Sequence, residues 1–351
     1  MNPRIQTPSE ILSHVQKPQL RTIDGVSLER EDWMIVCGGF EDRTLGALKS
    51  AIATGIPFNV LIIEYEPFIP QNRIEEIRDL CRKAGNSILE IPYNRQEPMG
   101  FGNRLLQSLP VNNGRVFIDI SGMSRLLIVQ VLVAFLTTPV GFSKASIVYA
   151  EAEEYPPSEK EATTILAQSD SDPTFTIFFL SSGVFNVTLL PELSSYAPAA
   201  MQTRLIAFPT LDTHQLIALR AELQPSRLSF IEGVPPAPHN AWRLKTIAAA
   251  NCLKEIPNAE IYQTSTLFYD ETLDLLLKLY EQHGIHERIL VSPTGSKMQA
   301  VAVGITPAFV EDVQIVYPTP NDFLKPERYT HGVGPVHLLP IDNFRQARIS
   351  L

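Results

Sequence analysis

Two short turns of small and cationic residues carry the chemistry that this sequence offers most clearly. One is "SGMSR" at 121–125, and the other is "SPTGSK" at 292–297. Each follows a short apolar run and precedes a helical pattern. A turn of small residues lets backbone N–H groups approach a ligand closely, and the N-terminus of the following helix favours negative charge there. The two turns therefore predict binding of a phosphate or carboxylate group, although serine and threonine could also cap the helices without any ligand.

A third polar stretch, "GGFEDRT" at 38–44, follows the first expected strand. Arg43 could bind an anion, and Glu41 or Asp42 could accept a ribose hydroxyl or a proton; the three side chains could instead cap the next helix and pair with one another. The equivalent residues of the second half, 212–214, do not keep this charge pattern. The candidate ligand-binding residues are Gly38, Gly39, Glu41, Asp42, Arg43, Asp119, Ser121, Gly122, Ser124, Arg125, Ser292, Thr294, Gly295, Ser296 and Lys297.

Other common site patterns are missing from the sequence. Neither turn matches the GxxxxGK[ST] phosphate loop or the GxGxxG dinucleotide fingerprint. The histidines lack zinc-site spacing, so we expect neither a metal nor a cofactor, and no catalytic residue is assigned. The cysteines, Cys37, Cys81 and Cys252, are interpreted as buried thiols in a reducing compartment.

The two turns belong to a chain that repeats itself. "EYEPFIPQN" at 64–72 matches "EGVPPAPHN" at 232–240, and "IVY" at 147–149 matches the same letters at 315–317. "GVFNVTLLP" at 183–191 resembles "GVGPVHLLP" at 332–340. The order of these matches predicts a tandem duplication. Its parts are an N-terminal arm at 1–31, a first repeat at 32–196, a second repeat at 201–344 and a C-terminal tail at 345–351.

Each repeat alternates strand and helix patterns. The expected strands of the first repeat are "WMIVCGG", "FNVLIIEY", "SILEIPY", "RVFIDI" and "ASIVYAE", and those of the second are "RLIAF", "RLSFIE", "AEIYQT", "RILVSP" and "VQIVYP". This pattern predicts an α/β fold, a tandem duplication of a Rossmann-like three-layer unit with parallel central sheets. Each repeat is expected to be followed by a short β-hairpin or strand extension: "FTIFFLSS" and "GVFNVTLLP" resemble a hairpin appended to the first repeat, with "GVGPVHLLP" as its remnant in the second.

Bulk composition limits the partners. The chain has 351 residues and a net charge of −9, which argues against a protein that grips duplex DNA through a basic face. The most apolar run, 126–142, is interrupted by Gln130 and Pro139 and is too short for a membrane helix, which needs about 20 apolar residues. The N-terminus lacks the apolar core of a signal peptide. We therefore expect a cytoplasmic protein without a membrane partner.

The second turn carries a family resemblance. "SPTGSKMQAVAVG" resembles the strand–"TGGTKxM"–helix motif of the CARF domains, which are CRISPR-associated Rossmann-fold sensors, and of their SAVED relatives; the matching residues are Thr294, Gly295, Ser296, Lys297 and Met298. "DISGMSRLL" is similar to a weaker version of the motif, through Ser121, Gly122, Ser124 and Arg125.

The resemblance implies a function. CARF domains bind a cyclic oligonucleotide as dimers, and SAVED domains are fused CARF-like pairs in antiphage signalling. A tandem chain of this kind would be a nucleotide-binding sensor or adaptor in prokaryotic defence or signalling. It would act with a separate effector or complex subunit, because the sequence shows no nuclease, protease or membrane segment. Two alternatives stay open: an enzyme acting on a nucleotide or phosphate ester through Asp119, Glu41 or Asp42, and a structural scaffold subunit.

Overall fold

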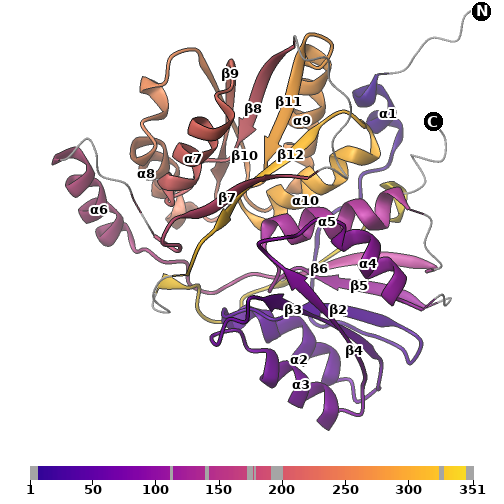
Figure 1. The fold of residues 1–351 in the computed structure, drawn as a ribbon. Helices are drawn as coiled ribbons and strands as arrows, with labels where there is room; N and C mark the ends of the chain where they lie inside the picture. Colours follow the sequence, from indigo (N-terminus) through magenta and orange to yellow (C-terminus); the bar gives the residue numbers. More distant parts are fainter. Residues whose placement is uncertain are drawn as a thin grey trace, which may run out of the picture. The chain divides into compact units, whose positions relative to one another are not determined.

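The computed structural model describes residues 7–110, 114–138, 142–171, 177, 179–190, 201–323 and 328–344. The chain forms two compact α/β units (Figure 1). One combines Gln16–Pro156 with Tyr329–Leu351, and we call it the seven-stranded unit after its sheet; the other combines Met1–Val15 with Pro157–Arg328 and is called the six-stranded unit. The compact units thus differ from the sequence repeats at their ends.

The sheet of the seven-stranded unit has the order β1-β13-β6-β5-β2-β3-β4. The five strands from β6 to the edge strand β4 are parallel, β13 runs antiparallel to β6, and β1 runs antiparallel to β13. Every residue of β2 is buried, as expected for a central strand that is covered on both faces. The strands are β1 (Arg21–Ile23), β2 (Trp33–Cys37), β3 (Asn59–Glu66), β4 (Ser87–Asn94), β5 (Arg115–Asp119), β6 (Lys144–Ala150) and β13 (Val336–Pro340).

Helices cover both faces of this sheet. Figure 1 shows α2 and α3 on one face and α4 and α5 on the other. All residues of α5 from Leu126 to Leu136 are buried, which explains why its sequence is apolar around the whole helix. Among the described residues, none of the helices has the length and apolar character needed to cross a bilayer. The helices are η1 (Asp42–Leu45), α2 (Gly46–Ile52), α3 (Ile74–Lys83), α4 (Phe101–Ser108) and α5 (Arg125–Thr137).

The six-stranded unit has the sheet order β10-β9-β8-β11-β12-β7. Again five strands are parallel, and β7 pairs antiparallel with β12. The strands are β7 (Val184–Leu189), β8 (Gln202–Ala207), β9 (Arg227–Val234), β10 (Ala259–Ser265), β11 (Glu287–Ser292) and β12 (Gln314–Pro320). The helices are α1 (Pro8–His14), α6 (Glu159–Ser171), α7 (Thr213–Leu223), η3 (Pro238–Asn240), α8 (Trp242–Ala250), η4 (Leu253–Glu255), α9 (Tyr269–His283), α10 (Lys297–Ile305) and η5 (Thr306–Ala308).

The two sheets follow one plan. In both, the first parallel strand lies centrally, the second and third extend to one side, and the fourth and fifth extend to the other. The matched segments in β3 and β9 therefore occupy the same position in their sheets, as the repeat predicted. The expected α/β fold with two Rossmann-like units is confirmed, and so are all ten expected parallel strands.

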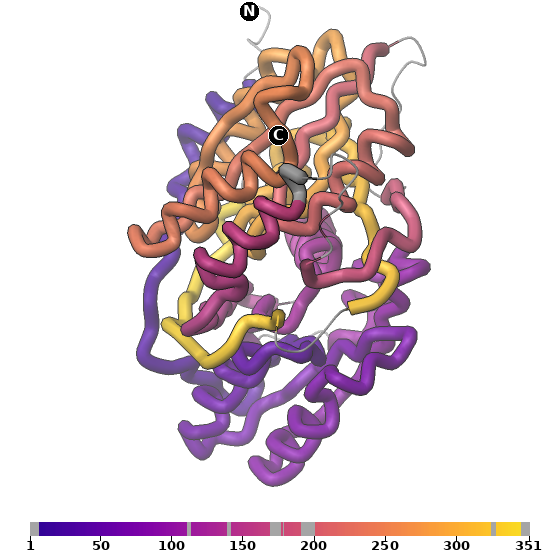
Figure 2. The backbone as a smooth tube through the Cα atoms, turned by 90° about the vertical axis from the view of Figure 1, so that its left-hand side faces the viewer, coloured from indigo at the N-terminus to yellow at the C-terminus, as the bar shows by residue number. Residues whose placement is uncertain are grey.

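The last strand of each repeat joins the sheet of the other repeat. β7 ends the first repeat but pairs with β12 (Figure 1), whereas β13 ends the second repeat and pairs with β6. Figure 2 shows the yellow C-terminal segment among the indigo and purple parts of the seven-stranded unit. We call β7 and β13 the exchanged strands. The strand extension expected after the first repeat is present as β7, but it completes the sheet of the other repeat; the other arm of the expected hairpin, 175–182, lies partly outside the described residues.

The exchanged strands pair in equivalent register. Val148 on β6 faces Leu338, and Val316 on β12 faces Leu189. These residues are related by the same two sequence matches, "IVY" with "IVY" and "VFNVTLLP" with "VGPVHLLP". Both sequence matches therefore correspond to equivalent positions in the two sheets. In each case the matched strand of one repeat pairs with the matched terminal strand of the other repeat. Because a slip of one residue would turn every side chain to the opposite face, the shared register indicates one conserved packing arrangement within the chain.

The expected N-terminal arm is divided between the units. α1 packs with α9 in the six-stranded unit, where the Ser9 N–H donates to the Glu281 carboxylate at 2.6 Å. β1 pairs with β13 at the edge of the seven-stranded sheet. The expected C-terminal tail at 345–351 and the repeat junction near 196–201 fall largely outside the described residues.

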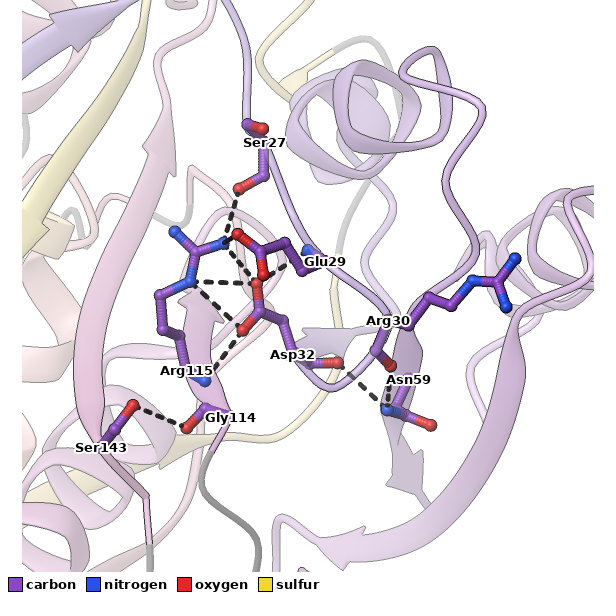
Figure 3. A network of polar contacts seen from close by, with 8 residues as sticks. All are labelled: Ser27, Glu29, Arg30, Asp32, Asn59, Gly114, Arg115 and Ser143. Atoms are coloured by element: carbon purple, nitrogen blue, oxygen red, sulfur yellow. Dashed lines mark hydrogen bonds and ion pairs between the residues drawn. The ribbon is translucent and has the colours of Figure 1, made fainter.

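A charged cluster fixes the amino ends of the strands in the seven-stranded unit (Figure 3). Asp32 is buried, and its carboxylate accepts hydrogen bonds from the Arg115 backbone and guanidinium and from the Glu29 N–H at 2.8–3.2 Å. Burial opposes ionisation of Asp32, but these hydrogen bonds outweigh it and lower its pKa. Asn59 donates to the carbonyl oxygens of Arg30 and Asp32. The cluster joins β5, the loop before β2 and β3.

We expect Asp32→Asn to lower the free energy of unfolding by about 1.5–3 kcal/mol at pH 7, the usual range for charged hydrogen bonds. Because folding lowers the Asp32 pKa, the stabilisation is full above its unfolded value of about 3.9 and is lost as pH falls through the folded value. Urea titration at pH 7 and near pH 3 measures both effects. The exposed Glu29→Gln is the control and should change stability little; equal stability of Asp32→Asn and wild type at pH 7 would contradict the assignment.

Candidate functional site

Both predicted turns lie where the strand order reverses. In the seven-stranded unit the chain runs from β2 outward through β3 and β4 and then returns to β5 on the other side of β2. The loops after β2 and β5 therefore leave neighbouring strands in opposite directions, which is the usual ligand position in open α/β sheets. β8 and β11 create the same point in the six-stranded unit. All the candidate residues belong to these two edges.

The glycines of the seven-stranded unit bring two loops into contact. A methyl group at Gly39 would lie 3.1 Å from the Gly122 Cα, and one at Gly122 would lie 2.2 Å from the Cys37 carbonyl oxygen. The stretches 38–44 and 121–125, separate in sequence, thus meet through their backbones. These glycines allow another group to approach the turn closely, as predicted. In this structure that group is the backbone of the neighbouring loop. Gly38 lies at the same strand end and donates its N–H to the Ile63 carbonyl.

The polar residues at the end of β5 stabilise the turn. The Asp119 carboxylate accepts the Ser121 N–H at 2.9 Å, and the Ser121 hydroxyl accepts the Ala150 N–H at 2.9 Å. Both side chains are buried. Asp119 and Ser121 therefore connect the turn to β5 and β6.

Ser124 is the N-cap of α5. Its hydroxyl accepts the Leu127 N–H at 3.3 Å, and its own N–H donates to the Tyr65 hydroxyl at 2.6 Å. Burial raises the pKa of Tyr65 well above its usual value, so this phenol stays neutral. Arg125 is the first residue of the helix and is half-buried, which places a cation at the positive end of the helix dipole.

The charged residues after β2 pair with one another. Arg43 is buried and donates to the Glu41 carboxylate at 2.7 and 2.9 Å and to the Tyr149 hydroxyl at 3.1 Å. Burial disfavours the charged guanidinium, but Glu41 outweighs this and raises the Arg43 pKa. In this arrangement Glu41 already compensates the Arg43 charge, so the pairing alternative from the sequence describes these two residues.

Glu41 and Asp42 also hold the segment that leads into β13. The Thr330 hydroxyl donates to Glu41 at 2.8 Å, and the Gly332 N–H donates to Asp42 at 3.1 Å. Arg73 donates to the other Asp42 oxygen at 2.8 Å. The loop at 38–44 is thus attached to residues 330–332, which lead into the exchanged strand β13. The order of the elements in the sequence could not indicate this contact.

The "SPTGSK" turn has its own internal bonds. The Thr294 hydroxyl donates to the Phe208 carbonyl at 2.7 Å, joining the loops after β11 and β8. Ser296 and Gln299 form a reciprocal capping box at the start of α10. A methyl group at Gly295 would lie 2.3 Å from the Gln299 side-chain oxygen and 2.9 Å from the Phe208 Cβ, so a side chain there would displace these neighbours. Lys297, the first residue of α10, is half-buried and occupies the place that Arg125 holds on α5.

Sequence reasoning missed two residues of the six-stranded unit. Asp212 accepts the N–H groups of Phe179 and Leu180 at 2.7 and 2.9 Å, and the His214 imidazole lies 3.0 Å from the Ser181 hydroxyl. They hold the segment before β7 as Glu41 and Asp42 hold the segment before β13. The repeat showed that both residues lie within 212–214, the equivalent of 41–43. The sequence could not show which residues they contact.

Thr44 was also missed. Its hydroxyl is buried without a hydrogen-bond partner among the described residues and lies 2.7 Å from the position of a methyl group at Gly39. This places an unused hydroxyl at the meeting point of the two glycine loops. The sequence indicated the stretch but gave no reason to select this residue.

Metal and thiol chemistry gain no support from the described part of the chain. No group of three or more histidine, cysteine or acidic residues there is arranged to hold a metal ion. Cys37 and Cys81 are buried as expected, whereas Cys252 is exposed, which corrects the expectation. Cys252 lies in the short connection between α8 and η4, which explains its exposure.

No protein-family model and no curated protein matches this chain. Among solved structures, the cytoplasmic domain of a prokaryotic cation chloride cotransporter is similar at 10% identity and a TM-score of 0.22, covering 86% of this chain and 98% of that one. An MccF-like protein from Streptococcus pneumoniae in complex with AMP aligns at 9% identity and a TM-score of 0.21, covering 88% and 98%. Escherichia coli diaminopropionate ammonia lyase aligns at 11% identity and a TM-score of 0.17, covering 84% and 65%. At these TM-scores the likenesses carry no functional argument.

We expect Gly122→Ala to destabilise the protein by about 1–3 kcal/mol, because the added methyl would meet the Cys37 carbonyl, which cannot move without disturbing β2. Gly38→Ala is the matched control, since the tightest contact of its methyl would be the flexible end of Ile74 at 3.1 Å and its other contacts, at 3.6 and 3.9 Å, are of ordinary length. Thermal unfolding of both variants measures the difference. If the two variants melt together, the loops after β2 and β5 are not in contact.

Proposed function

We propose that this protein binds an anionic small molecule of the nucleotide class at the strand ends of its units. We further propose that it acts as a sensor or adaptor in a prokaryotic defence or signalling system, together with a separate effector or complex subunit. The observation that carries the proposal is the repeated arrangement of one cation, Arg125 or Lys297, at the first position of a helix that starts where the strand order reverses.

Electrostatics support an anionic ligand at these points. Helix N-termini favour negative charge, and a lysine or arginine in the first turn adds to the positive potential there. Neither helix has an acidic residue in its first turn. The net charge of −9 does not oppose this, because the local potential governs the choice of a small ligand.

The hydrogen bonds of the three candidate carboxylates favour binding of a ligand over its chemical conversion. Glu41 and Asp42 accept hydrogen bonds from side chains and from the exchanged segment, and Asp119 accepts one from the turn itself. A general base needs access to a substrate proton. Because these three groups serve the protein's own loops, the enzyme alternative has less support than the sensor.

We expect Arg125→Ala and Lys297→Ala each to weaken nucleotide binding by roughly 10–150-fold, the loss of one charged contact. A thermal-shift screen with mononucleotides and cyclic oligonucleotides selects the ligand, and calorimetry measures its affinity. The controls are Lys144→Ala, at the start of β6, and Lys278→Ala, on the exposed side of α9. Unchanged affinity in both site variants would refute the placement, and turnover of the selected ligand would favour the enzyme.

A further inference from the structure

The loop between β10 and α9 lies directly beside the "SPTGSK" turn. The Ser296 hydroxyl donates to the Thr266 carbonyl at 2.7 Å. A methyl group at Gly233, near the end of β9, would lie 2.7 Å from the Thr266 side chain and 3.5 Å from Gln299. Three chain segments therefore meet at the N-terminus of α10.

This loop presents an aromatic ring. Phe268 follows Thr266 by two residues, so the two Cα atoms are at most about 7 Å apart. Its side chain is 46% exposed. The loop backbone is held in place, because the N–H groups of Leu267 and Phe268 both donate to the Ser265 hydroxyl at 3.1 and 3.0 Å. An exposed aromatic ring on a fixed backbone is the kind of group on which nucleobases stack.

Charge gives the two sides of this junction different roles. The first turn of α9 contains Asp270 and Glu271, and the Glu271 carboxylate accepts the Ser265 N–H at 2.8 Å. The first turn of α10 contains Lys297 and no acid. A phosphate group is therefore favoured on the α10 side and disfavoured on the α9 side, where an uncharged base would be accepted.

The strand end beneath the turn has an unused polar group. Ser292, the last residue of β11, is fully buried, and its hydroxyl has no hydrogen-bond partner in the described part of the chain. A buried hydroxyl without a partner costs free energy. This observation is independent of the helix N-terminus and marks, at the same strand end, a polar group whose hydrogen-bonding capacity is unused.

We propose that the six-stranded unit binds a nucleotide with its phosphate at Lys297 and its base stacked on Phe268. The inference rests on the proposed function and adds base recognition to it. The equivalent loop of the seven-stranded unit, between β4 and α4, exposes Met99 instead of an aromatic residue. Aromatic base recognition at this position is thus a property of the six-stranded unit.

The test compares ADP, which has a base, with inorganic pyrophosphate, which has none. Calorimetry on the full chain should show that Phe268→Ala weakens ADP binding by about 5–150-fold, the range for loss of one base–aromatic stack, and leaves pyrophosphate binding unchanged. Phe268→Trp should retain ADP affinity, and Lys297→Ala should weaken both ligands. The matched control is Phe185→Ala, which removes a phenyl ring that is 49% exposed on β7 in the same unit.

The possible outcomes distinguish failure of the base-stacking inference from failure of the proposed anion-binding function. If the wild type binds ADP and pyrophosphate equally, or if Phe268→Ala binds ADP as tightly as wild type, base stacking is refuted and anion binding stands. Equal weakening of both ligands by Phe268→Ala would show a structural role and also overturn the inference. If the wild type binds neither ligand, the proposed function of this unit fails, and the inference fails with it.

Discussion

The antiparallel pairing of β13 with β6 and of β7 with β12 is the constraint on which both units depend. These ladders complete each sheet with a strand from another part of the chain. They also position the segments that precede the strands. Those segments bind the loops after β2 and β8, through Glu41 and Asp42 in one unit and Asp212 in the other. In the seven-stranded unit, the candidate ligand-binding edge is therefore built from residues that are 289 and 290 positions apart.

This arrangement divides the candidate residues into two groups. Glu41, Asp42 and Arg43 make bonds that secure the exchanged segment or one another. Arg125 and Lys297 instead begin helices whose serine caps are already satisfied within the turns. The first group maintains the loops, and the second supplies positive charge at the strand ends. In the proposed binding function, the first group would set the geometry of the site and the second its affinity.

Much of the fold could be predicted because its signals are local. Five apolar runs with intervening helical patterns in each copy determine the parallel strands, and the serine of each turn does cap a helix. The exchanged strands could not be assigned, because "GVFNVTLLP" has the same strand pattern whichever sheet it joins. The partners of Glu41 and Asp42 could not be predicted either, because Thr330 and Gly332 lie almost 300 positions away and reach these residues only through the pairing of β13. Phe268 could not be selected from the sequence, because its exposure and the contact of its loop with Ser296, through Thr266, arise only in the fold.

The exchange has a consequence for how the protein is made. A ribosome finishes β2 to β6 early, but the strand that protects the edge of β6 lies at Val336–Pro340, close to the end of the chain. The half that is synthesised first is thus the last to be completed, and until then it presents an open strand edge to other proteins. Neither half corresponds to one continuous stretch of the gene. The six strands β7 to β12 nevertheless follow one another between residues 184 and 320, so a single recombination event inside the gene segment of the seven-stranded unit would insert or remove that whole sheet.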